Sequence, residues 1–303
     1  MTFEPQGVYA ASLTPMTADL EPDLGRLVAH SKWLLANGCD GLGILGTTGE
    51  ANSLTLKQRR AVIDAAIVAL PRERLMPGVG SCALADVVEL TKACLAGGVR
   101  DVLCLPPFYY KGVPDAGVEA FFATLIERVG DARLRLYLYN FPQLTGYPFP
   151  LALVERLKAR FGATIAGMKD SSGDWSNMKL FAEKVPGFKV FAGTEQYLAD
   201  ILAVGGAGCI SATTNLTSPW AKAVLDAKEP AARAKAQELL TAMRLAIQAK
   251  PLIPALKGLM QELTGDAAWR HIAPPNALLT AAETGALRDK LAELGLNNLK
   301  LAA

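Results

Sequence analysis

The chain has 303 residues, of which 51% are hydrophobic and 20% are charged, so it is long enough to bury the core of one large α/β domain. Its 31 basic residues nearly balance its 29 acidic residues, and a net charge of +2 gives no reason to expect nucleic acid or a membrane surface as a partner. No segment reaches the length of a membrane span, and five scattered cysteines without metal-site spacing favour a reduced, cytoplasmic protein over a disulfide scaffold.

Short apolar runs alternate with longer helical patterns along most of the chain. The runs have the composition of buried parallel strands and are Val8–Leu13, Gly41–Leu45, Leu75–Gly80, Asp101–Leu105, Leu134–Tyr139, Thr164–Met168, Lys189–Ala192 and Gly208–Ala212. The helical patterns after them are 23–37, 56–70, 83–96, 117–129, 151–161, 175–184, 196–204 and a helix near 219–225. Eight such strand–helix units predict an α/β fold, a (β/α)8 TIM barrel over residues 1–226, with an open doubly wound sheet as the alternative.

The pattern changes after residue 226, where only helices are predicted. These are 230–248, 251–263 and 280–294. Because no low-complexity linker precedes them, residues 227–303 are predicted to form a small C-terminal helical domain that packs on the barrel.

Two polar residues at neighbouring strand ends suggest covalent chemistry, because the C-terminal ends of barrel strands carry the active site. Lys169 follows the sixth apolar run. A lysine at a strand end is usually exposed, but one withdrawn from water loses its charge more readily, and the neutral amine can attack a ketone to form a Schiff base. Tyr139 ends the fifth run. Tyrosines in strands usually belong to the core, yet at this end a phenol can transfer a proton.

The second run leads into a loop that starts Gly46-Thr47-Thr48. The loop is either an ordinary turn that caps the next helix or a cradle of N–H and hydroxyl groups for a substrate carboxylate. Glu50, in the same loop, is expected to make structural hydrogen bonds rather than to act as a base. His30, on the first predicted helix, is expected to be solvated and far from the strand ends.

Four motifs in this order resemble the dihydrodipicolinate synthase/N-acetylneuraminate lyase family. They are GTTGEA at 46–51, PPFYY at 106–110, LYNFP at 138–142 and GMKDSSGD at 167–174. The resemblance covers essentially the whole chain. It implies a (β/α)8 barrel that assembles as a homo-oligomer, a tetramer or a dimer, and that uses no metal or organic cofactor.

The resemblance also implies roles for particular residues. Lys169 is implied to form a Schiff base with pyruvate or another small 2-keto acid, and Tyr139 to transfer protons. Thr47 and Thr48 match the pair near the keto-acid carboxylate. Tyr110 matches a tyrosine that reaches in from the neighbouring subunit and completes a relay through Thr47.

Departures from the family pattern narrow the expected activity. True dihydrodipicolinate synthases carry an arginine two residues beyond the YNxP motif, and this chain has Leu144 there, which cannot replace a bidentate guanidinium. Neuraminate lyases hold sugar hydroxyls with a serine near the eighth strand, and the matching residue here is Ala212. The remaining candidate contacts for a smaller polyol chain are Ser171, Gly193, Glu195, Ser211 and Thr213, and Gly46 is a further candidate substrate-binding residue in the loop after the second run.

The sequence therefore predicts a Schiff-base aldolase that reversibly cleaves a 2-keto-3-deoxy (sugar) acid to pyruvate and an aldehyde. A dehydratase or deaminase acting on a related 2-keto acid would use the same covalent intermediate, and 4-hydroxy-tetrahydrodipicolinate synthase is a further alternative. The alternative that is not an enzyme is a ligand-binding or regulatory protein that has kept the barrel fold.

Overall fold

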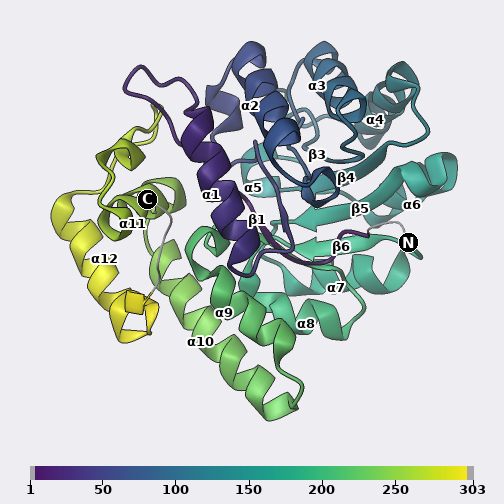
Figure 1. The fold of residues 1–303 in the computed structure, drawn as a ribbon. Helices are drawn as coiled ribbons and strands as arrows, with labels where there is room; N and C mark the ends of the chain where they lie inside the picture. The colour runs from purple at the N-terminus through teal and green to yellow at the C-terminus, as the bar shows by residue number, and fades with distance from the viewer. Residues whose placement is uncertain (1–3, 299–303) are drawn as a thin grey trace.

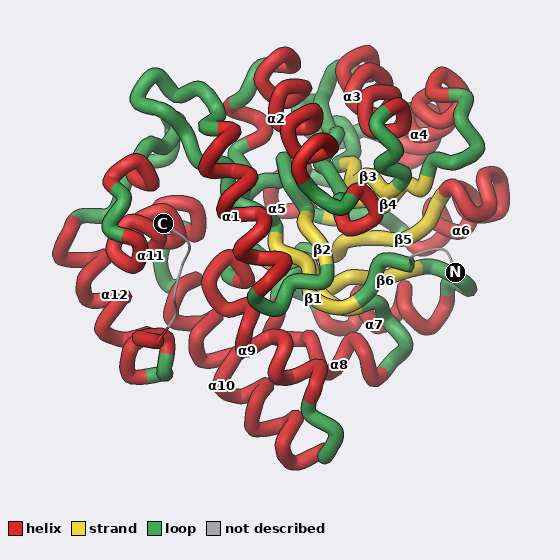
Figure 2. The backbone as a smooth tube through the Cα atoms, viewed as in Figure 1, coloured by secondary structure: helices red, strands yellow, loops and turns green. Residues whose placement is uncertain are grey.

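The computed structural model describes residues 4–298. Seven parallel strands form one curled sheet in the order β2-β1-β7-β6-β5-β4-β3 (Figures 1 and 2). The strands are β1 Gly7–Ala10, β2 Gly41–Leu42, β3 Asp101–Cys104, β4 Arg135–Asn140, β5 Ile165–Asp170, β6 Lys189–Ala192 and β7 Gly208–Ser211. Nearly all their residues are buried, which explains why the sequence shows continuous apolar runs rather than alternation.

The prediction of a regular strand at Leu75–Gly80 is wrong. Pro77 has no N–H, so a continuous ladder cannot form through this segment. The backbone N–H of Met76 nevertheless donates to Leu42 on one side, at 2.8 Å, and that of Val79 donates to Leu103 on the other, at 2.9 Å. The segment therefore joins the two edge strands, β2 and β3.

Nine helices in the described part of the chain accompany the strands, and Figure 1 shows the longer ones around the outside of the sheet. They are α1 Leu24–Ala36, α2 Leu56–Ala69, α3 Leu84–Ala96, α4 Asp115–Val129, α5 Pro142–Thr145, α6 Leu151–Phe161, α7 Trp175–Lys184, α8 Leu198–Ala203 and α9 Thr214–Asp226. Local signals set several starts: α2 has a capping box between Thr55 and Gln58, and Pro142 occupies the first turn of the short helix α5, which the sequence reading lacks.

The inside of the curled sheet is filled by side chains from strands and strand ends. A separate buried cluster contains Tyr9, Leu103, Tyr137, Phe191 and Ile210, and none of its fully buried members comes from a helix. The ring centroids of Tyr137 and Phe191 are 6.0 Å apart in an edge-on arrangement. These side chains fill the inside of the curled sheet, and in folds of this kind the active site lies at the carboxyl ends of the strands.

Three further helices, α10 Pro230–Gln248, α11 Leu252–Thr264 and α12 Ala281–Glu293, lie to one side of the molecule (Figure 1). Their apolar faces share a hydrophobic cluster with Leu13, Ala212 and Leu216, which belong to the strand–helix part. A domain boundary at 226/227 therefore stays a prediction. In the described residues, no helix is long and apolar enough to cross a membrane.

His30 corrects another expectation, because it is buried rather than solvated. Its Nε2 lies 2.8 Å from Asn215 Oδ1, and its ring meets Trp269 edge-on at 5.1 Å. Burial lowers the pKa of His30 to about 4, and the hydrogen bond to Asn215 only partly opposes that shift. The helical pattern gave no sign that this face of α1 would be covered by the distant Trp269.

Candidate active site

Lys169 and Tyr139 face each other at the ends of two adjacent strands. They are register partners on β5 and β4, and Lys169 lies within β5 rather than just after it. Lys169 Nζ donates a hydrogen bond to Tyr139 Oη at 3.1 Å and lies 4.4 Å from the centroid of the ring. Each side chain belongs to a residue that is only 4% exposed. The structure thus brings together an amine and a phenol that are largely withdrawn from water.

Thr47 extends this pair. Its Oγ1 is 3.4 Å from Tyr139 Oη. Burial acts to raise the pKa of Tyr139, but the charge of Lys169 and hydrogen bonds with Thr47, Lys169 and Ser171 together outweigh it, so the pKa is lowered from the ordinary value of 10.0. A phenol with a lowered pKa is better suited to accept a proton near neutral pH.

A cavity of about 570 Å³ opens onto this pair. Its wall includes six of the residues expected from the sequence, namely Thr47, Thr48, Tyr139, Lys169, Ser171 and Gly193. Gly46 instead borders a small adjoining void of about 10 Å³. Tyr110 is 71% exposed and contacts Tyr109 edge-on, so within one chain the structure does not bring Tyr110 to the cavity.

The loop after β2 presents donors to the cavity. Among residues 4–298, the backbone N–H groups of Thr47 and Thr48 have no hydrogen-bond partner. Glu50, at φ 54°, fixes the loop from behind: its carboxylate forms a fully buried ion pair with Lys257 and accepts a hydrogen bond from the N–H of Ala273 at 2.9 Å. The expectation that Glu50 has a structural role is confirmed, and the free donors fit a carboxylate.

Gly193 is required by close packing at the ends of β5 and β6. Its N–H donates to Asp170 O at 2.6 Å, and a Cβ at this position would lie 2.2 Å from Ser171 Oγ. The Asp170 carboxylate accepts a hydrogen bond from the N–H of Ser172 at 2.8 Å. The absence of a side chain at position 193 therefore allows the ends of β5 and β6 to pack closely beside Ser171 on the cavity wall.

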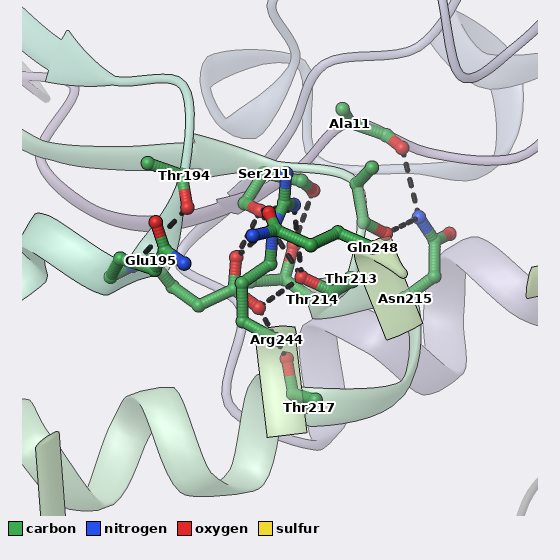
Figure 3. A network of polar contacts seen from close by, with 12 residues as sticks. Ala11, Thr194, Glu195, Ser211, Thr213, Thr214, Asn215, Thr217, Arg244 and Gln248 are labelled. Carbon is green, nitrogen blue, oxygen red and sulfur yellow. Dashed lines mark hydrogen bonds and ion pairs between the residues drawn. The ribbon is translucent and has the colours of Figure 1, made fainter. Parts of the chain in front are cut away.

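Glu195 and Ser211 lie behind the cavity wall rather than in it. Both are fully buried in the polar network of Figure 3. The Glu195 carboxylate accepts hydrogen bonds from the hydroxyls of Ser211, Thr213 and Thr217, the last at 2.9 Å. Their role as substrate contacts stays a prediction, because in this arrangement the polar atoms of both residues are engaged within the network.

Arg244 is a cavity residue that the sequence reading missed. It comes from α10 and is 8% exposed. The signal was present, because Leu240, Met243 and Ile247 form the buried stripe of α10 and Arg244 lies in that stripe. Four amide side chains also line the wall: Gln143, Gln196, Gln248 and Asn276. Leu144, by contrast, is 52% exposed and lies outside the wall.

The arrangement has the parts of a covalent site for carbonyl compounds. Lys169 supplies an amine, Tyr139 supplies an acid or base in contact with it, and the loop at Thr47 and Thr48 supplies donors for an anion.

Comparison with known proteins gives consistent matches. The model of the dihydrodipicolinate synthetase family matches residues 4–293. An uncharacterized DapA-like lyase of Chloroflexus aurantiacus is 34% identical over 287 residues, which cover 94% of this chain and 95% of that protein. The crystal structure of dihydrodipicolinate synthase from Agrobacterium tumefaciens superposes with a TM-score of 0.87 at 29% identity, covering 95% of this chain and 99% of the other. YagE, a prophage protein of this family from E. coli K12 solved in complex with pyruvate, gives a TM-score of 0.86 at 28% identity, covering 96% and 99%.

Proposed function

The chain belongs to the dihydrodipicolinate synthetase family and is a lyase, and from this premise we propose that it forms a Schiff base between Lys169 and a 2-keto acid. The proposed reaction is the reversible cleavage of a 2-keto-3-deoxy acid into pyruvate and an aldehyde. The observation that carries the proposal is the 3.1 Å hydrogen bond between Lys169 Nζ and Tyr139 Oη inside a cavity. The complex of YagE with pyruvate supports a 2-keto acid as the ligand class.

The reaction begins with the amine. Lys169 passes a proton to the Tyr139 phenolate and attacks the C2 ketone of the substrate as a free amine; Tyr139 then returns the proton to the departing hydroxyl, so that loss of water leaves an iminium ion and restores the phenolate. Tyr139 takes the proton of the C4 hydroxyl, the C3–C4 bond breaks, and its electrons move to the iminium to form an enamine while the aldehyde leaves. The enamine is then protonated at C3, and water hydrolyses the iminium to release pyruvate and restore the lysine.

The substrate carboxylate is proposed to bind at Thr47 and Thr48. Their unpartnered N–H groups and the hydroxyl of Thr48 supply donors on the cavity wall, and the buried ion pair of Glu50 with Lys257 holds the loop in place. Fixing the carboxylate in this way orients the C2 ketone toward Lys169.

The assembly and the full fold are part of the proposal. We place Tyr110 in the site of a neighbouring subunit of a homo-oligomer, a dimer or tetramer, where its hydroxyl extends the relay from Tyr139 through Thr47. The exposure of both Tyr109, at 75%, and Tyr110, at 71%, supports a covering partner. We also propose that residues 75–80 take the place of the third strand and so complete a (β/α)8 barrel, since they hydrogen-bond to β2 and to β3. Five free cysteines support a cytoplasmic location.

A panel of 2-keto-3-deoxy acids with coupled detection of pyruvate tests the proposal. Lys169→Ala should abolish pyruvate release, whereas Lys179→Ala, a change of a half-exposed lysine on α7, should leave it intact. Analysis of the organic products separates cleavage from dehydration or deamination, because only cleavage yields an aldehyde together with pyruvate. Pyruvate release by Lys169→Ala at the rate of the unchanged protein would refute the proposal.

A further inference from the structure

Among residues 4–298, Arg244 is the one arginine on the wall of the cavity that contains Lys169. It reaches the cavity from α10 and is tied to the ends of β6 and β7 by the network in Figure 3. The other ionisable groups on the described wall are Lys169, Tyr139 and Asp170, of which only Lys169 is a cation former, and the carboxylate of Asp170 is engaged with Ser172 and Asn177. A second anionic group on the substrate would therefore find its counter-charge at Arg244.

The network fixes the orientation of the guanidinium. Nη1 lies 3.1 Å from Ser211 Oγ and 3.2 Å from Thr213 Oγ1, and Nε donates to Gln248 Oε1 at 3.0 Å. A hydroxyl has a single proton to donate, and both of these hydroxyls also bond to the Glu195 carboxylate, which can only accept. Each hydroxyl therefore donates to Glu195 and accepts from Arg244, so that neither can donate to a substrate.

One side of the guanidinium remains open. Arginine has five N–H donors, of which the network uses those of Nε and Nη1. The two N–H groups of Nη2 have no hydrogen-bond partner within residues 4–298, and Arg244, which is 8% exposed, lines the cavity. Glu195 Oε2 lies 3.7 Å from Nη1, and the hydroxyls of Ser211 and Thr213 bond to both groups. The remaining donors fit an acceptor with the geometry of a carboxylate.

We propose that Arg244 binds a second carboxylate, at the end of the substrate that becomes the aldehyde. This inference rests on the proposed function and names its substrate class, a 2-keto-3-deoxy dicarboxylic acid. Leu144 is apolar and exposed and cannot bind that carboxylate, so the proposal assigns its recognition to Arg244 on α10. The amides of Gln143, Gln196 and Asn276 on the same wall suit hydroxyl groups along the chain between the two carboxylates.

A matched pair of aldehydes tests the inference in the condensation direction with pyruvate. Tartronate semialdehyde and glyceraldehyde differ only in that a carboxylate replaces a hydroxymethyl group. The unchanged protein should show a kcat/KM at least about 10-fold higher for the carboxylated aldehyde, in line with the energy of a charge-assisted hydrogen bond. Equal values, or a preference for glyceraldehyde, would overturn the inference without any variant.

Variants then assign the preference to the residue. Arg244→Gln should lower kcat/KM for tartronate semialdehyde by about 10- to 100-fold, mainly through KM, and reduce the value for glyceraldehyde much less. Arg244→Lys should restore part of the loss, because it keeps the charge but not the two parallel donors. Arg233→Gln, an exposed change on the same helix, should leave both values unchanged. A carboxylate preference that survives in a folded Arg244→Gln protein would overturn the assignment.

Borohydride trapping of pyruvate separates this inference from the proposed function. If the unchanged protein traps pyruvate on Lys169 but does not discriminate between the aldehydes, only the inference about Arg244 fails. If no pyruvate is trapped, the proposed function fails first. If Arg244→Gln does not fold, the preference of the unchanged protein and the Arg244→Lys result decide the question.

Discussion

Removing one partner of the buried ion pair between Lys257 and Glu50 should strongly lower the free energy of unfolding. Both side chains are fully buried, and Lys257 Nζ also donates to His271 O at 2.7 Å. In Lys257→Met, the Glu50 carboxylate keeps the N–H of Ala273 but loses its counter-charge in the core. Leaving such a charge unpaired costs about 3–5 kcal/mol, whereas breaking an exposed pair costs about 0–1 kcal/mol.

Urea unfolding at one protein concentration measures this difference. The matched control is Lys222→Met, which breaks an exposed pair with Asp226. The free energy of unfolding of Lys257→Met should fall by about 3–5 kcal/mol, and that of Lys222→Met by less than about 1 kcal/mol. Adding Glu50→Gln to Lys257→Met should recover part of the loss, because the stranded charge is removed. Equal destabilisation by the two single lysine variants would refute the reasoning.

Three further predictions concern the site and the core. Tyr139→Phe should reduce kcat by about 10²- to 10³-fold while pyruvate is still trapped on Lys169, because the variant loses the proton acceptor and keeps the amine; a kcat within twofold of the unchanged protein would argue against that role. Tyr110→Phe should reduce kcat and Tyr109→Phe should not, since only the hydroxyl of Tyr110 is placed in the relay; equal effects would contradict the relay. Burial lowers the pKa of His30 from 6.5 to about 4, so the unfolded chain binds more protons between these values and stability should fall as the pH drops from 6.5 to 4. Relative to His30→Gln, this loss should approach about 3 kcal/mol in urea unfolding at the two pH values, and parallel profiles would show that His30 is not buried as described.

Much of the fold could be predicted because strands that are buried on both faces of a parallel sheet appear in the sequence as continuous apolar runs. The runs at 189–192 and 208–212 end within one residue of β6 and β7, and the helices at 175–184 and 230–248 have the predicted bounds. Residues 75–80 could not be read correctly, because apolar composition does not reveal that Pro77 breaks the ladder while its neighbours still bond to β2 and β3. The family resemblance that rests on the four motifs is confirmed by the match over residues 4–293.

The site was predictable where its residues follow strands and unpredictable where distant elements meet. The ends of β4 and β5 are adjacent in any such sheet, so Lys169 and Tyr139 could be paired from sequence alone. Glu195 stays a predicted substrate contact, and its contacts with three hydroxyls and Arg244 could not be foreseen, because these partners are distant in sequence. The contribution of α10 to the cavity wall likewise depends on tertiary packing. In the sequence it is indicated only by Arg244, a charged residue within the apolar stripe of that helix.

The most direct test of the central claim is peptide mass spectrometry of the protein after borohydride reduction in the presence of pyruvate. The account predicts one added group with the mass of reduced, covalently linked pyruvate, located on Lys169 and missing from Lys169→Ala. A protein that remains unmodified, or that carries the group on another lysine while Lys169 stays free, would contradict it.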